Sequence, residues 1–159
     1  MKHLPTLPRL AMTAVAASAV AMAIGGVSIA HAGGAHASQH RMTLTEVQTG
    51  SAFVSISHTK GGKPGDGFIF HSKLSTRAGK QVGTLDAECI LVLMKHTLCT
   101  GVFTLPGGTV SGTALIPDNN GPVRVAVTGG TGRYATVRGQ VTSHSTGENT
   151  SRDVFELDY

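Results

Sequence analysis

The segment from residue 125 to residue 141 reads VAVTGGTGRYATVRGQV and carries the strongest structural signal in the chain. An alternating apolar run ends in three closely spaced glycines, as in the turn that holds the pyrophosphate of a dinucleotide such as NAD. That turn must open a helix, whereas the residues after Gly132 are rich in β-branched side chains and are interrupted by Gly139 and Gly147. The pattern therefore predicts two strands joined by a glycine turn and argues against NAD binding.

The chain has the same character from Arg41 onward. Alternating or β-branched segments include FVSISH, GFIFHSKL, QVGTLDAECILVL, TLCTGVFTL and RDVFELDY, and turn sequences such as TKGGKPGD and PDNNGP separate them. Eight or nine short strands with no convincing helix predict an all-β sandwich or barrel. The 21 glycines suit a small barrel, where glycine relieves crowding as strands coil.

The first 32 residues are typical of a secretory signal peptide. Lys2 and Arg9 precede an uncharged apolar run, which ends in the small-residue pattern A-H-A at residues 30–32. Cleavage after Ala32 is expected, with Ala37 as a second site, and the mature protein is then secreted. The alternative is an uncleaved membrane anchor, because the apolar run is just long enough to cross a bilayer.

Residues 33–42 are small and polar and are interpreted as a flexible leader, and residues 43–159 are expected to form one domain. The histidines in or beside the leader have no carboxylate or cysteine nearby, so no metal site is expected there. Removing Lys2 and Arg9 lowers the net charge from +4 to +2. This mild charge, with no Trp and no basic run, argues against nucleic-acid binding.

The two cysteines, Cys89 and Cys99, are an even pair in a protein expected outside the cytoplasm, which favours a disulfide. If they lie opposite each other in a hairpin, Leu91 faces Thr97 and the turn lies at residues 93–95. A disulfide between directly opposed residues would hold the two strands in register.

Alternation sorts this hairpin into two faces. The face expected inside the barrel holds Ala87, Cys89, Leu91, Gly101, Phe103 and Leu105. The other face holds Asp86 and Glu88, which are interpreted as solvated carboxylates. An acid pair within the cavity remains the alternative reading of these two residues.

Four segments, GDGFIFHSKL, GKQVGTLDAECILV, GGTVSG and VAVTGGTGRYATVRGQV, resemble in that order segments of the allene oxide cyclase and dirigent protein superfamily. The resemblance covers about residues 65–143, and its most specific part is the closing pattern Gly-Gly-Thr-Gly-x-Tyr-x-x-x-x-Gly. It implies an eight-stranded antiparallel β-barrel. In such a barrel Gly129, Gly130 and Gly132 would form a tight connection between two strands and need positive φ.

The resemblance also implies an activity. Members of the superfamily close rings or steer radical coupling, and they use the barrel interior as a mould, without a cofactor, for a largely apolar substrate. A small apolar organic ligand, no cofactor and a homotrimer are therefore expected. The chain would be a cyclase, an isomerase or a dirigent-like guide, and the alternative is a secreted barrel that binds a ligand or partner without chemistry.

Site residues follow from the same resemblance. Glu46 matches a carboxylate that stabilises developing positive charge, and Ser72 and Gln48 stand where the family has asparagines that hold a water. Glu46 and Ser72 are thus the expected catalytic residues, and Gln48 is an expected ligand contact.

Three further positions are expected to contact the ligand. Cys89 matches a cavity cysteine, although a disulfide to Cys99 would make it mainly a staple. An aliphatic residue near Leu115 or Ile116 replaces the pocket tyrosine of the family, and we take Ile116 as the contact. Arg138 would reach the cavity only if the neighbouring valines face outward.

Overall fold

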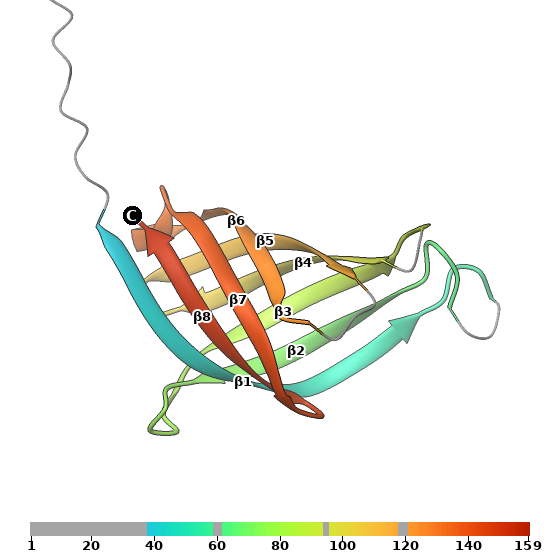
Figure 1. Ribbon diagram of the computed structural model, residues 1–159, viewed down its shortest axis with the longest axis horizontal. Helices are drawn as coiled ribbons and strands as arrows, with labels where there is room; N and C mark the ends of the chain where they lie inside the picture. Colours follow the sequence, from blue (N-terminus) through green and yellow to red (C-terminus); the bar gives the residue numbers. More distant parts are fainter. Residues whose placement is uncertain (1–37, 59–61, 94–95, 118–120) are drawn as a thin grey trace, which may run out of the picture. The chain divides into compact units, whose positions relative to one another are not determined.

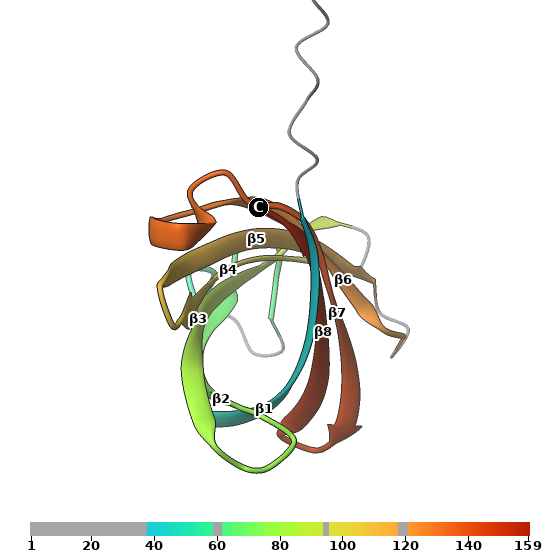
Figure 2. The same cartoon turned by 90° about the vertical axis from the view of Figure 1, so that its left-hand side faces the viewer.

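The computed structural model describes residues 38–58, 62–93, 96–117 and 121–159, and in them eight antiparallel strands close into a barrel (Figure 1). The strands follow chain order around the barrel, and β1 closes it by pairing with β8. Their bounds are β1 Gln39–Val54, β2 Gly67–Ser75, β3 Gln81–Leu91, β4 His96–Leu105, β5 Gly108–Pro117, β6 Val123–Gly130, β7 Arg138–Gly147 and β8 Thr150–Asp158. Figure 2 looks into the ring that they form. The predicted eight-stranded antiparallel barrel is confirmed.

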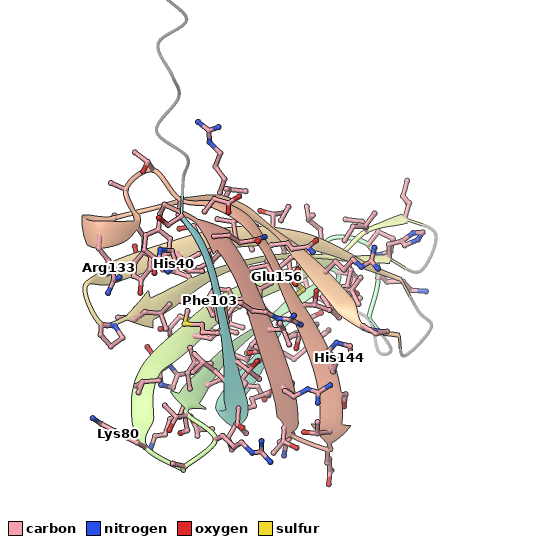
Figure 3. All side chains as sticks on the ribbon, turned by 60° about the vertical axis from the view of Figure 1, so that its left-hand side comes forward. His40, Lys80, Phe103, Arg133, His144 and Glu156 are labelled. Atoms are coloured by element: carbon pink, nitrogen blue, oxygen red, sulfur yellow. A yellow bond between two sulfur atoms is a disulfide. The ribbon has the colours of Figure 1, made fainter. Side chains whose placement is uncertain are left out.

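The barrel core is built from the apolar positions of the alternating strands. Phe103 on β4 and Phe155 on β8 meet edge to face, with ring centroids 5.0 Å apart. Around them the core cluster holds Leu44, Leu74, Leu85, Leu105, Val110, Tyr134, Val137, Val141 and Leu157. Figure 3 shows Phe103 inside the barrel, whereas Lys80, in the turn between β2 and β3, points outward.

The hairpin of β3 and β4 has the predicted register. Cys89 and Cys99 are directly opposed and form a disulfide, and Leu91 faces Thr97. The two strands are therefore covalently linked through a pair of neighbouring residues, as expected. Of the predicted turn, residues 94 and 95 lie outside the described residues.

The two faces of this hairpin also agree with the alternation. Cys89 and Phe103 are buried, whereas Asp86 and Glu88 are exposed on the outside of the barrel. Asp86 Oδ1 lies there within hydrogen-bond distance of the imidazole of His71, 2.7 Å from its Nδ1. The solvated reading of Asp86 and Glu88 is thus correct, and an acid pair made of them inside the cavity is wrong.

The glycine segment joins β6 to β7 through one 3-10 turn, Gly132–Tyr134, and not through an α-helix. Gly132 has a φ of +61°, and a Cβ there would lie 2.1 Å from the carbonyl oxygen of Gly107. Gly130 is not among the residues with positive φ. It is needed for a different reason, because a Cβ would lie 2.4 Å from the carbonyl oxygen of Thr109.

The first strand begins earlier than the predicted domain boundary at residue 43. Residues 39–42 pair with residues 158–155 of β8, and the ring of His40 stacks on Tyr159 with centroids 4.4 Å apart. The end of β8 supplies hydrogen-bond partners that composition alone does not reveal, so this part of the predicted leader is strand. The predicted signal peptide, residues 1–32, lies outside the described residues.

No helix in the part of the chain that the structure describes is both long and apolar enough to cross a membrane.

Candidate functional site

Two carboxyl groups lie on the inner face of the barrel, Glu46 from β1 and Asp153 from β8. The register of these strands places Glu46 opposite Ser151, two residues before Asp153. Because side chains two residues apart in a strand share a face, Asp153 lies on the same face as the buried Phe155, and Glu46 on the same face as the buried Leu44. The pairing of β1 with β8 therefore brings both carboxyls into one interior site.

One serine hydroxyl, that of Ser151, connects these carboxyls, and a second, that of Ser72, extends the network to β2. Ser72 Oγ on β2 donates to Glu46 Oε1 at 2.6 Å. Ser151 Oγ lies 2.9 Å from Glu46 Oε2 and 2.9 Å from Asp153 Oδ1. Ser72 and Asp153 are 0% and 1% exposed, and Glu46 is half-buried. A continuous polar chain thus crosses three adjacent strands, β2, β1 and β8, at the wall of an apolar core.

The contacts of Ser151 indicate how many protons the pair holds. A serine hydroxyl has one hydrogen and can donate to only one of the two carboxyl oxygens that lie 2.9 Å from it. The other contact is a hydrogen bond only if that carboxyl is itself protonated. Every contact is satisfied when one carboxyl is protonated and donates to Ser151 while Ser151 donates to the other. Asp153 is the more buried of the two, and burial disfavours its charged form, so the proton is assigned to Asp153.

The electrostatics of the site agree with this assignment. Burial, followed by the nearby charge of Glu46, raises the pKa of Asp153 to about 7. Hydrogen bonds from Ser143 and Ser151 act in the opposite direction but are outweighed. At neutral pH the site therefore contains one carboxyl that is poised to give up a proton.

An interior cavity of about 100 Å³ lies against the pair. Glu46, Asp153 and the hydroxyl of Ser143 line it together with apolar side chains and glycines, among them Phe70, Leu85, Phe103, Ile116 and Val125. Asp153 Oδ2 is buried and has no hydrogen-bond partner. For comparison, an apolar cavity of about 150 Å³ binds benzene. Within the described residues no group of three His, Cys, Asp or Glu side chains could hold a metal ion.

The structure brings Glu46 and Ser72 together, and Ile116 lines the same cavity. Gln48 lies opposite Ser72 in the register and is half-buried, but it does not belong to the cavity lining. Of these predicted residues, Glu46 and Ile116 line the cavity, Ser72 contacts Glu46 directly, and Gln48 lies outside the lining.

Two predicted contacts lie away from the cavity. Cys89 is buried in the disulfide, and its partner Cys99 takes the place on the cavity wall. Arg138, the first residue of β7, is exposed, whereas Val137 just before the strand and Val141 within it are buried, so the placement of this arginine in the cavity is not supported.

Asp153 and Ser151 were not among the residues predicted from the sequence. Both belong to the C-terminal segment SRDVFELDY, which was interpreted only as a strand. A signal was nevertheless present, because Asp153 occupies the same parity as Phe155 and Leu157, which are both buried. A charged residue on the apolar parity of a strand indicates an interior carboxyl.

Comparison with solved structures identifies chains of similar fold. "Pyocyanin demethylase" is similar with a TM-score of 0.67 and 29% sequence identity, over 74% of this chain and 99% of that one. The pterocarpan synthase dirigent protein GePTS1 is similar with a TM-score of 0.61 and 16% identity, over 77% of this chain and 86% of that one. The fold is a dirigent-like barrel.

The Diels-Alderase AbmU from Streptomyces koyangensis shares this dirigent-like barrel. Its TM-score is 0.59 with 20% identity, over 73% of this chain and 64% of that one. No family model and no curated protein sequence matches the chain. The fold suggested by the sequence resemblance thus agrees with the structural neighbours.

Proposed function

We propose that this dirigent-like barrel binds a small, largely apolar organic molecule in its interior cavity and catalyses a cyclisation or isomerisation by acid–base chemistry at Glu46 and Asp153. The observation that carries the proposal is the pair itself. Two carboxyls in unequal environments share one serine and lie at the wall of an otherwise apolar cavity. Pairs of this kind divide the roles of acid and base between them.

The chemistry needs only groups that the chain supplies. Asp153 gives its proton to one atom of the substrate, and the Glu46 carboxylate accepts a proton from another, so the net proton count of substrate and site is unchanged. Ser151, which contacts both carboxyls, returns the proton from Glu46 to Asp153 after turnover. The apolar walls hold the substrate in one folded shape, which brings its reacting atoms together.

The names of the structural neighbours support a barrel that acts on small organic molecules, and two of the three name ring formation or synthesis. One is a demethylase of pyocyanin, one a Diels-Alderase and one a pterocarpan synthase. The neighbour with the highest identity of the three, the demethylase, makes pyocyanin a rational first probe, beside polyenes, oxylipins and phenolics.

The test begins with binding and proceeds to turnover. Each probe is screened for thermal stabilisation of the purified barrel, and binders are incubated and analysed for products by mass spectrometry. We expect Glu46→Gln and Asp153→Asn to lower turnover by about 100-fold, the scale of general acid–base catalysis. Glu148→Gln, which removes an exposed carboxylate from the turn between β7 and β8, is the matched control.

Two results would contradict the proposal. Binding without turnover of any probe, in a broad screen, would favour a ligand-binding barrel without chemistry. Turnover that survives in both carboxyl variants would place the reaction elsewhere.

We also propose that the protein is secreted. The disulfide of Cys89 and Cys99 supports an oxidising compartment, because such bonds are rare in the cytosol. Intact mass of protein recovered from culture medium should correspond to a chain that starts after Ala32. A full-length, membrane-retained chain would contradict this.

We also propose the homotrimer that the family resemblance implies, and the outer surface offers a site for a subunit contact. Ile90, Leu98 and Leu115 are cross-strand neighbours on β3, β4 and β5, and each is exposed by 39–57%. An exposed apolar cluster of this kind is typical of a protein–protein contact. Light scattering should give three times the monomer mass, and Leu98→Lys should reduce it; a monomer at all concentrations would refute the proposal.

A further inference from the structure

The charged side chains that line the cavity are acidic. Glu46 and Asp153 are the acidic residues that line it, and among the residues that the structure describes no Lys, Arg or His does so. The ion pairs of the described residues, Arg41 with Glu156 and His71 with Asp86, involve neither carboxyl. The basic residues next to Asp153 and Ser72 in sequence, Arg152 and Lys73, lie on exposed positions of β8 and β2.

The pair therefore keeps a net negative charge with no cation beside it. With one proton shared through Ser151, one carboxylate charge remains at the cavity wall. Serine hydroxyls offset part of the cost of burying that charge, but they cannot neutralise it. A positive charge entering the cavity would be attracted by a carboxylate in surroundings where water screens little.

Two further features of the cavity fit a cationic occupant. Asp153 lines the cavity, and its buried Oδ2 has no hydrogen-bond partner among the described residues, so it offers an acceptor to a ligand beside the Ser143 hydroxyl. Phe70 and Phe103 also line the cavity, and aromatic faces attract organic cations.

From these observations we infer that the cavity prefers a small aromatic cation, such as a pyridinium-type ring, to a neutral molecule of the same shape. The inference rests on the proposed function, because it names the class of ligand for the same cavity. The positive charge lies against Glu46 and Asp153, and the ring packs between the apolar walls.

A matched pair of probes tests the inference. N-methylpyridinium and toluene have nearly the same shape and differ in charge, and their affinities are measured by titration calorimetry on the intact protein at neutral pH. We expect the cation to bind at least about tenfold more tightly, because dehydration of the cation offsets most of the Coulomb attraction. In Glu46→Gln we expect the preference to disappear.

The variants locate the binding. Asp153→Asn, which keeps the Glu46 charge, should retain the cation preference and shows that the fold survives a change at this site. Arg152→Gln, on the exposed face of β8, is the control and should bind both probes as the natural chain does. If Glu46→Gln fails to fold, loss of cation binding on adding excess toluene to the natural chain shows that both probes share the interior cavity.

The possible failures are distinct. Toluene binding as tightly as the cation would overturn the inference and leave the proposed ligand-binding cavity standing. Cation binding that is unchanged in Glu46→Gln, or not displaced by toluene, would also overturn it, since the cation would then occupy an outer acidic surface. No binding of either probe would overturn the proposed function and the inference with it.

Discussion

Replacing Asp153 by asparagine should change how the stability of the protein depends on pH. Asp153 has a pKa of about 7 in the folded protein, against 3.8 for an ordinary aspartate. At about 1.4 kcal/mol per pKa unit, ionising it in the folded state costs about 4 kcal/mol relative to the unfolded chain. Because the pKa of Asp153 is higher in the folded protein than in the unfolded chain, protonated Asp153 carries no penalty for folding below pH 3.8. The cost of ionising it grows as the pH rises from 3.8 to about 7, and the free energy of unfolding falls by the same amount.

The measurable part of this loss lies between pH 5 and pH 8. At pH 5 about 1.6 kcal/mol has been lost, and by pH 8 about 4 kcal/mol, so the difference is about 2–3 kcal/mol. Asparagine cannot ionise. The free energy of unfolding of Asp153→Asn minus that of the natural chain should therefore rise by about 2–3 kcal/mol between the two pH values.

Urea unfolding followed by circular dichroism, without reductant and at one protein concentration, measures both values. Taking the difference between variant and natural chain cancels the titration of all groups that do not interact with Asp153. Glu148→Gln, at an exposed turn, serves as the control and should show a constant difference. A difference for Asp153→Asn that stays within about 0.5 kcal/mol across the range would refute the buried, proton-sharing assignment of this carboxyl.

Three further outcomes are expected. Cys99→Ser should lower the free energy of unfolding by about 2–3 kcal/mol, the value for a short closed loop, and a change below about 0.5 kcal/mol would contradict a structural role of the disulfide. Gly132→Ala should cost at least twice as much as Gly79→Ala in urea unfolding, because both have positive φ but only Gly132 faces a backbone atom; equal costs would count against the close approach of the turn to Gly107. Turnover of any substrate should fall as the pH rises through about 7, since Asp153 acts in its protonated form, and a pH-independent rate would exclude it as the acid.

The all-β character of the fold was accessible from the sequence because several local signals agreed, whereas the closed eight-stranded barrel was predicted from the family resemblance. In the β3–β4 hairpin, the assumption that Cys89 lies opposite Cys99 gave the strand register. The alternation of apolar and polar residues then gave the inner and outer faces. The glycine segment was informative because β-branched residues, and not helix formers, follow Gly132. These signals act over a few residues and do not depend on the rest of the chain.

The site was only partly accessible, because its parts come from distant strands. Glu46 was suggested by resemblance, but its partner Asp153 depends on the pairing of β1 with β8, which no local pattern specifies. For Arg138 the local pattern was the better guide than the family resemblance. The family motif drew attention to it, while the simpler alternation, which turns Val137 and Val141 inward, already placed it outside.

The seam between β1 and β8 determines when the carboxyl pair can form during folding. Glu46 and Ser151 are 105 residues apart in sequence, so their contact forms only when the ring of strands has closed. Contacts of such long range are slow to form, because the chain must first lose the entropy of a large loop. In a refolding experiment, strand content should thus return before any property of the carboxyl pair does. Catalysis would then be a kinetic marker of barrel closure, and a chain with seven strands in place would be a folded-looking but inert intermediate.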